Sequence, residues 1–250
     1  MISALLVDVG NTRVKWAMLE GGHMGDGSAV AHAAGPLAAV VRPHWNALPA
    51  PRRVLVSSVR GESANAQLRE VCRSLWGVEC ELVRAVPSAF GLSNGYRDPA
   101  SLGVDRWLAM LAAWHARREA CCVADCGSAV TIDAIDADGR HLGGLIIPGM
   151  RLMHDALRRG TAIPETSLVA GESFFGRDTA GAVASGIAQA IAGAIERAVA
   201  AASAVGRQRP RLMVTGGDGP AIAEALSATC EIRPALVLEG LALVAQESGR

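Results

Sequence analysis

The sequence contains almost no lysine or tyrosine. Only Lys15 is a lysine among 24 basic residues, and Tyr96 is the single tyrosine of the 250-residue chain. Acidic residues also number 24, so the chain lacks the surplus of positive charge with which nucleic-acid and membrane-surface proteins meet phosphate groups. Half of the residues are hydrophobic, which excludes a disordered chain and allows one large domain or two modest ones.

Targeting and membrane-spanning segments are not expected either. The N-terminal residues have no cationic region, and Asp8 and Asn11 interrupt their short apolar run, unlike a signal peptide. The longest charge-free apolar stretch, 179–195, is mostly Ala and Gly, which favours a packed interior helix over a membrane span. The six cysteines have no CxxC spacing, which favours reduced, mostly buried thiols over a redox or metal role. We therefore expect a soluble, cytoplasmic protein.

The order of apolar and turn-forming segments predicts two copies of one α/β unit. In each copy an apolar strand ends at Asp-x-Gly and returns as a second strand, and helices follow. The first copy begins at 3–9 and the second at 120–125, nearly half the chain later. We therefore predict a duplicated architecture with domains at residues 1–117 and 118–250. The expected strands are 3–9, 13–19, 53–59, 79–83, 120–125, 130–135 and 141–147; the expected helices are 36–48, 62–76, 102–118, 149–159, 180–204 and those after Gly219 and Pro234; residues 85–101 are expected to form a long polar loop.

The first candidate motif is Asp8-Val-Gly-Asn-Thr12. The sequence contains no Walker-type phosphate loop and no GxGxxG, GxSxG or HExxH motif. A nucleotide site would therefore need another kind of phosphate-binding segment. A carboxylate at the end of a buried strand is costly unless it is solvated, hydrogen-bonded or facing a cation. Gly10 permits close approach of backbone N–H groups, and Asn11 and Thr12 add donors for an anion. The alternative is a Gly-Asn hairpin turn whose Asp caps its own backbone.

Two further motifs repeat these ingredients at strand ends. Asp125-Cys-Gly-Ser-Ala-Val-Thr131 adds two hydroxyl donors, Ser128 and Thr131. In Met213-Val-Thr-Gly-Gly217 a strand ends in a glycine pair, which can lie flat against a nucleobase or ribose. Each motif is weak alone, but three of them on strand ends of a duplicated chain favour a phosphate or nucleotide site.

The fourth motif is Gly103-Val-Asp-Arg106 at the expected start of a helix. An adjacent Asp and Arg there ordinarily match the helix dipole and form a surface charge pair. Beside a phosphate site, the carboxylate can accept a hydroxyl proton and the guanidinium can bind a carboxylate or phosphate.

Together the motifs resemble those of the type III pantothenate kinases. The matching set, in order, is Asp8–Thr12, Gly103–Arg106, Asp125–Thr131, Gly143-Gly144 with Pro148-Gly149, and Thr215–Gly217. The resemblance extends over essentially the whole chain. It implies the α/β fold of the acetate and sugar kinase/Hsc70/actin superfamily: two duplicated actin-like (ribonuclease H-like) domains with the nucleotide cleft between them. It also implies ATP-dependent phosphorylation of pantothenate to 4'-phosphopantothenate, the first step of coenzyme A biosynthesis, by a cytoplasmic homodimer that needs Mg²⁺ and a monovalent cation, K⁺ or NH₄⁺.

The resemblance further implies roles for single residues. Asp105 matches the general base, and Tyr96 and Thr179 match substrate contacts. Asp125 matches a monovalent-cation ligand, and Asp8 would hold Mg²⁺ through water. The other substrate-motif residues are Gly103, Val104 and Arg106. The residues that match the ATP site are Asp8, Val9, Gly10, Asn11, Thr12, Arg13, Val14, Lys15, Ser128, Gly216 and Gly217.

Two other functions stay open at this point. One is a kinase of the same superfamily that acts on another small hydroxy compound, such as a sugar or an acid. The other is a non-catalytic nucleotide-binding regulator with the same fold. The six histidines show no metal-ligand spacing and are expected to be surface or satisfied core residues.

Overall fold

The chain folds into two compact units. The computed structural model describes residues 3–32, 35–163, 168, 174–206 and 208–247. Unit 1 comprises Met1–Phe90, Tyr96–Ala112 and Ala235–Arg250, and unit 2 comprises Gly91–Gly95 and Ala113–Pro234. The units are therefore not continuous stretches of chain. The division at residues 117 and 118 stays a prediction of where two sequence copies meet.

Unit 1 is built on a mixed sheet. Its strands are β1 (Ser3–Val9), β2 (Arg13–Glu20), β3 (His23–Met24), β4 (Ser28–Ala31), β5 (Arg53–Ser58) and β6 (Cys80–Leu82), with β7 (Ser88–Ala89) outside the sheet. The strand order is β3-β2-β1-β5-β6, and β4 also pairs with β2. The β1–β2 and β2–β3 pairs are antiparallel, whereas β1–β5 and β5–β6 are parallel. The helices are α1 (Leu37–Trp45), α2 (Glu62–Trp76), α7 (Leu236–Glu247) and a 3₁₀ turn, η1 (Pro99–Ser101); α3 (Val104–Arg117) starts in this unit.

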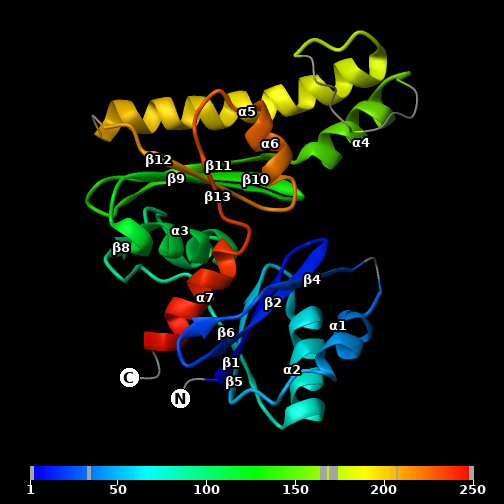
Figure 1. Cartoon of the computed structure of the whole chain (residues 1–250), viewed down its shortest axis with the longest axis vertical. Coiled ribbons are helices and arrows are strands. Elements are labelled where there is room, and N and C mark those ends of the chain that lie inside the picture. Colours follow the sequence, from blue (N-terminus) through cyan, green and yellow to red (C-terminus); the bar gives the residue numbers. More distant parts are fainter. Residues whose placement is uncertain (1–2, 33–34, 164–167, 169–173, 207, 248–250) are drawn as a thin grey trace. The chain divides into compact units, whose positions relative to one another are not determined.

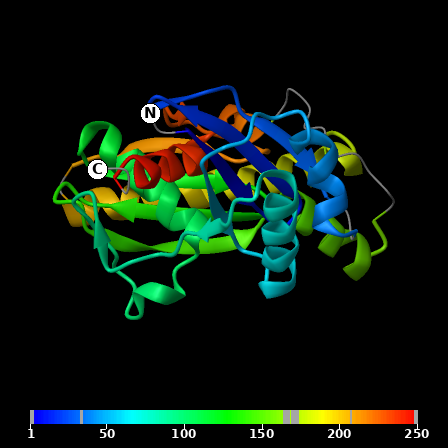
Figure 2. The same cartoon turned by 90° about the horizontal axis from the view of Figure 1, so that it is seen from below.

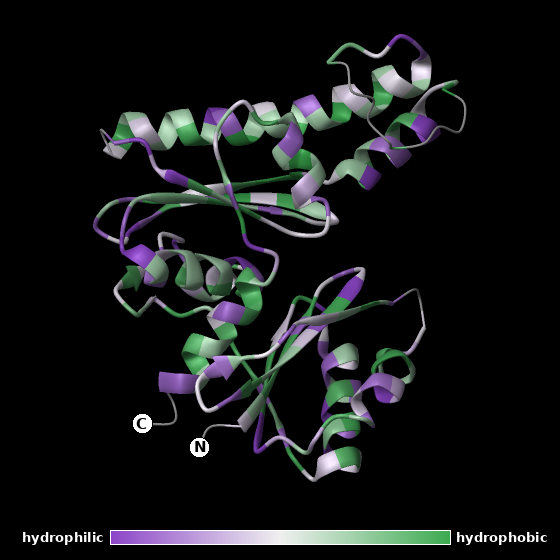
Figure 3. Cartoon of the chain, in the orientation of Figure 1, coloured by the Kyte–Doolittle hydropathy of each residue, from purple (hydrophilic) through white to green (hydrophobic). Residues whose placement is uncertain are grey.

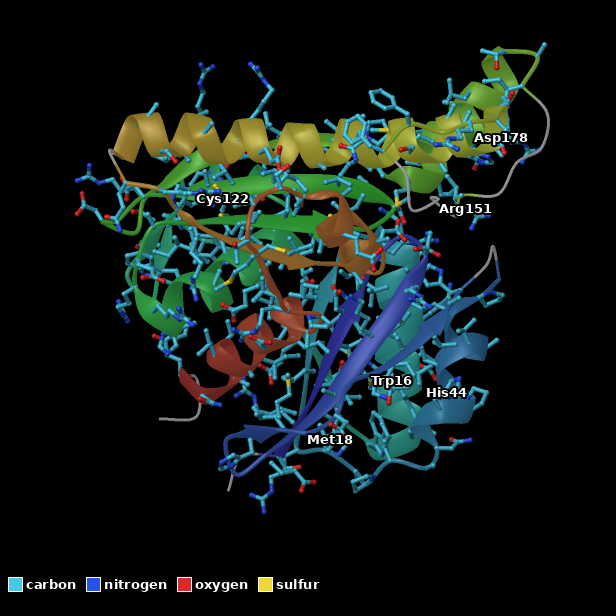
Figure 4. The ribbon with its side chains drawn as sticks, turned by 45° about the horizontal axis from the view of Figure 1, so that its top comes forward. Trp16, Met18, His44, Cys122, Arg151 and Asp178 are labelled. Carbon is cyan, nitrogen blue, oxygen red and sulfur yellow. The ribbon has the colours of Figure 1, made fainter. Side chains whose placement is uncertain are left out.

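Helices cover both faces of this sheet. Alternate residues of β1, such as Leu5 and Val7, pack in one core with α1 and α2, because successive side chains on a strand point to opposite faces. Figures 1 and 2 show α7 on the other face, against β1 and β5. Trp16, which is labelled in Figure 4 beside His44, meets Trp45 edge-to-face with ring centroids 6.2 Å apart. The apolar faces expected from the alternation are therefore buried.

The C-terminal helix is an integral part of unit 1. Most of its apolar residues are buried, among them Leu236, Leu238 and Leu241. It crosses α3 at Gly240, where a Cβ atom would collide with the carbonyl oxygen of Leu108. Only glycine allows so close a crossing of the two helix backbones.

Unit 2 repeats the sheet of unit 1. Its strands are β8 (Leu92–Ser93), β9 (Cys121–Cys126), β10 (Ala129–Ile135), β11 (His141–Pro148), β12 (Arg211–Thr215) and β13 (Glu231–Ile232), and its helices are α4 (Met150–Gly160), α5 (Thr179–Gly206) and α6 (Gly219–Ala225). The five-stranded order is β11-β10-β9-β12-β13. As in unit 1, the first three strands of the unit's sheet form an antiparallel meander and the next two run parallel to the first. This shared order and direction supports the prediction of a duplicated architecture.

The long helix α5 packs along one face of the unit 2 sheet, together with α4 and α6 (Figure 1). Its residues Ile187, Ile191 and Ile195 share a core with Ile132 and Val214 of the strands. Figure 3 shows α5 mostly in green and white, whereas α4 carries several purple segments. Within the described residues, no helix is long and apolar enough to cross a membrane. The expected interior helix at 180–204 is confirmed.

Candidate active site

Asp8 lies near the end of β1, on the sheet face that does not meet α1 and α2. Its pairing partners are Lys15 on β2 and Ser57 on β5, so the three side chains project from the same face. Fully buried Ser57 donates its hydroxyl proton to Oδ1 of Asp8 over 3.0 Å. Asp8 itself is only 9% exposed. The sheet register thus places the buried Asp8 carboxylate between the Ser57 hydroxyl on β5 and the lone lysine, Lys15, on β2.

Backbone and side-chain hydrogen bonds, two of them from His32, stabilise the turn that follows Asp8. The N–H of Gly10 donates to the carbonyl of Arg13 over 3.0 Å and closes the turn. His32 holds it at two further points: its Nε2–H donates to the carbonyl of Gly10, and its backbone N–H donates to the carbonyl of Thr12, each over 3.0 Å. Asn11, Thr12 and Arg13 remain exposed. The predicted phosphate turn is therefore rigid at its base and open at its tip.

Asp105 and Arg106 occupy the first turn of α3, where an acidic side chain also suits the helix dipole. Oδ1 of Asp105 accepts the backbone N–H of Arg106 over 2.8 Å. A Cβ atom at Gly103 would lie 2.7 Å from this oxygen, so a larger residue before the helix would displace the Asp105 carboxylate. Arg106 is only 6% exposed, and its Nη1 donates to the hydroxyl of Tyr96 over 2.6 Å. The structure thus brings together the three side chains expected to meet the substrate in unit 1.

In unit 2, Asp125 and Gly216 lie side by side at the C-terminal ends of the adjacent strands β9 and β12. Thr215, which ends β12, pairs with Asp125 near the end of β9. Gly216 follows with φ +91°, and a Cβ atom there would lie 2.5 Å from Oδ1 of Asp125 and collide with the carbonyl oxygen of Cys126. The protein's own backbone therefore requires this glycine.

Ser128 lies in the turn between β9 and β10. The N–H of Gly149 donates to the carbonyl of Ser128 over 3.1 Å, and the N–H of Asp218 donates to the carbonyl of Cys126 over 2.9 Å. A Cβ atom at Gly149 would collide with the carbonyl of Gly127, so this residue must also be glycine. Backbone contacts thus hold the turn that carries Ser128.

Thr179 is an exposed residue at the start of α5. The helix is capped by Asp178, labelled in Figure 4, whose Oδ1 accepts the N–H of Gly181 over 2.7 Å. Thr179 belongs to unit 2, whereas Tyr96, Asp105 and Arg106 belong to unit 1.

Comparison with known proteins identifies the family. The sequence matches the family model for type III pantothenate kinase over residues 4–201. A type III pantothenate kinase from Nitrosococcus oceani is 36% identical over 252 residues, which cover 98% of this chain and 95% of that protein. One from Halorhodospira halophila is 39% identical, covering 95% of each chain. This chain belongs to the type III pantothenate kinase family.

Membership in the type III pantothenate kinase family confirms the predicted enzyme class. The chain is a kinase that transfers a phosphoryl group from ATP to pantothenate in coenzyme A biosynthesis, and it uses a divalent metal ion with ATP. The family favours this activity over the kinase of another hydroxy compound and over the non-catalytic regulator.

Solved structures confirm the fold class. A Campylobacter jejuni protein described as a Baf family transcriptional activator superposes with a TM-score of 0.63 at 21% identity, covering 98% of both chains. An inorganic polyphosphate/ATP-glucomannokinase from Arthrobacter superposes with a TM-score of 0.51 at 15% identity, covering 99% of this chain and all of that one. At such identities the likeness shows the fold alone.

The residues present fit the divalent ion that this kinase family uses. In the described part of the chain, no three His, Cys, Asp or Glu side chains gather into a metal site. Mg²⁺ at a nucleotide site is typically bound through one or two carboxylates, waters and the phosphates themselves. The buried carboxylate of Asp8, near the end of β1, matches that pattern.

Cys126 can be set aside as a nucleophile of this kinase. Burial raises the pKa of its thiol to about 12, and the carboxylates of Asp125 and Asp218 act in the same direction. The side chain is therefore a neutral thiol at physiological pH and packs in the core of unit 2.

Two residues that hold the candidate site of this kinase were not singled out from the sequence. Ser57 is the penultimate residue of the apolar strand β5, and its proximity to Asp8 depends on the pairing of β1 with β5. His32 was expected to be a surface or satisfied core residue, and it is a buried one. In neither case does the local sequence carry a signal of the turn or carboxylate that the residue supports.

Proposed function

We propose that Asp105 is the general base of pantothenate phosphorylation and that Arg106 and Tyr96 position the substrate. The observation that carries this assignment is the buried Arg106 guanidinium, bonded to the Tyr96 hydroxyl directly beside Asp105. Pantothenate has a primary hydroxyl and a carboxylate. A carboxylate base can take the hydroxyl proton as the phosphoryl group arrives, and a guanidinium suits the substrate carboxylate. Thr179 is a further substrate contact, and Gly103 and Val104 shape the same turn.

Two turns bind the phosphates of ATP. In unit 1, the turn of residues 10–12, through the backbone N–H groups of Asn11 and Thr12, and the ammonium group of Lys15 hold the β- and γ-phosphates, as phosphoryl transfer requires positioning and charge neutralisation. In unit 2, the Ser128 hydroxyl donates to a phosphate, and Gly216 and Gly217 border the adenosine. Asp8 would hold Mg²⁺ through water, and the bound ion would supply neutralisation of the phosphate charge.

The test of this assignment is Asp105→Asn. Loss of a general base lowers kcat by ~10²–10⁴-fold, and the KM for ATP should stay nearly unchanged. The matched control is Asp98→Asn, because Asp98 is an exposed carboxylate upstream of the same helix that caps the 3₁₀ turn through the N–H of Ala100. Wild-type turnover by Asp105→Asn in a coupled ATPase assay with pantothenate would remove Asp105 from the role.

Asp125 is proposed as the ligand of a monovalent cation. Its carboxylate lies at a strand end beside a carbonyl oxygen of Cys126, and carboxylate and carbonyl oxygens are the donors that hard cations prefer. We expect faster turnover in K⁺ or NH₄⁺ than in Na⁺ buffer, and Asp125→Asn should abolish that difference. Equal rates in the three salts would refute the assignment.

A homodimer is proposed through β11 and α4. Strand β11 ends the sheet order of unit 2, and it leaves Leu145 48% and Ile146 63% exposed, with Leu152 of α4 also exposed. Leu145 and Ile146 point to opposite faces of this edge strand, so a second copy that packs along β11 and α4 would cover both in a self-complementary interface. Ile146→Glu should yield monomers in light scattering after gel filtration. Ile232→Glu, at the opposite edge of the same sheet, is the control, and a monomeric wild type would refute the dimer.

A cytoplasmic location is proposed from the substrate and the cysteines. All six cysteines are free thiols, which suits a reducing compartment that supplies ATP. Fractionation that recovers the protein with membranes or outside the cell would contradict it.

A further inference from the structure

Two cysteines of unit 1 lie in contact although they are on different elements. Cys72 is on the penultimate turn of α2, and Cys80 begins β6. Their Sγ atoms are 3.2 Å apart, and both are thiols. Cys72 is fully buried and Cys80 is partly exposed, so a small reagent can reach only the second of the two.

The surroundings give the two thiols different reactivity. The pKa of Cys80 lies below that of a free thiol, chiefly because Cys72 donates a hydrogen bond to its thiolate and also because Arg69 is nearby. The pKa of Cys72 is raised, first by that same hydrogen bond and then by burial. By contrast, burial raises the pKa of Cys121 and of Cys122, labelled in Figure 4, to about 12. Among these, Cys80 is the thiol equipped to attack.

We propose that Cys72 and Cys80 form a reversible disulfide when the protein meets a low-molecular-weight disulfide such as oxidised glutathione. The Cys80 thiolate attacks one sulfur of that molecule, its S–S bond breaks, and one glutathione leaves as thiolate. Cys72 then loses its proton and attacks Sγ of Cys80, and the second glutathione leaves. Two protein thiols are oxidised, one small disulfide is reduced to two thiols, and the two protons pass to the departing thiolates.

The cross-link needs little movement, and it connects a short edge strand of the sheet to a helix. The sulfur atoms need to approach from 3.2 Å to the ~2.05 Å of a disulfide. Strand β6 is the end of the sheet order and is three residues long, so the bond ties an edge strand to α2. Cys80 pairs with Val54 near the start of β5, whereas Ser57 lies near the other end of that strand. We therefore expect higher stability and unchanged turnover in the oxidised protein.

The experiment maps the bond in the folded wild-type enzyme. After incubation with oxidised glutathione and blocking of free thiols, trypsin should release the peptides 70–73 and 74–84 as one joined species, lighter than their sum by two hydrogens. Dithiothreitol should separate them. The melting temperature should rise by roughly 5 °C on oxidation, as expected for a short disulfide loop, and kcat should stay within about twofold.

Three variants separate the steps. Cys72→Ser should stop at a glutathione adduct on Cys80, and Cys80→Ser should lack both the adduct and the joined peptides. Cys230→Ser is the matched control, because Cys230 is a partly exposed thiol whose pKa is raised by burial, and it should still form the bond. The proposal is overturned if the wild type yields no joined peptides, or if Cys230 gains glutathione as fast as Cys80.

Discussion

Removing the hydroxyl of Ser57 tests whether the sheet positions Asp8 for catalysis. In Ser57→Ala, the carboxylate of Asp8 loses a buried donor at 3.0 Å while its remaining interactions stay. Hydrogen bonds to charged groups contribute about 1.5–3 kcal/mol. Because the carboxylate keeps other interactions, we expect the lower part of that range, about 1.5–2 kcal/mol. This corresponds to a melting temperature lower by roughly 3–8 °C.

The same loss should appear in the kinetics of ATP. If Asp8 orients the metal-bound phosphates, a loosened carboxylate should lower kcat/KM for MgATP by about tenfold, since each ~1.4 kcal/mol is a factor of ten. The assay is an ATP titration at saturating pantothenate, run beside a thermal melt. Ser58→Ala is the matched control: Ser58 is the next residue, points away from Asp8, and its hydroxyl donates to the carbonyl of Arg60 over 3.3 Å.

Two results would refute this reasoning. Wild-type kinetics in a destabilised Ser57→Ala would mean that the bond supports the fold alone. Equal losses in Ser57→Ala and Ser58→Ala would mean that the end of β5, and not the bond to Asp8, carries the effect.

Three further substitutions probe the remaining predictions. Lys15→Arg should raise the KM for ATP severalfold, because a planar guanidinium replaces a compact ammonium group opposite Asp8; unchanged ATP kinetics would make the lone lysine an accident of composition. Tyr96→Phe removes a hydroxyl bonded to Arg106 and should raise the KM for pantothenate by about 2–13-fold, a loss of ~0.5–1.5 kcal/mol; an effect confined to ATP would mean that this loop is misassigned. Gly216→Ala should lower the melting temperature by several degrees, because its Cβ collides with the end of β9 at a positive φ; a stable variant with wild-type melting would contradict that geometry.

Local patterns predicted the strands and the motif positions well. The alternation at 13–19 gave the hairpin with β1, and the helix predicted at 62–76 has the observed bounds of α2. Apolar periodicity is a property of neighbouring residues, so it can be seen without the fold. The positions of Asp8 and Asp125 at strand ends follow from the same patterns.

Features that depend on long-range pairing were not predicted. The sequence predicts that Gly216 borders a nucleoside, which stays a prediction, but it carries no sign that a Cβ atom at Gly216 would also collide with Cys126, which is far away in sequence. Strand β13 pairs only two residues with β12, too few to leave an apolar pattern. The expected loop at 85–101 contains two short strands and a 3₁₀ turn for the same reason.

The place of α7 sets an order for folding during synthesis. Unit 1 begins at the N-terminus, but one face of its sheet awaits a helix that starts at Leu236. At ribosomal rates of ~5–20 residues per second, β1 and β5 wait on the order of ten to thirty seconds for that cover. Unit 2 is almost entirely one continuous stretch and is complete before α7 emerges. The second half of the chain can thus finish folding first, while one face of the nascent first sheet stays uncovered until α7 emerges.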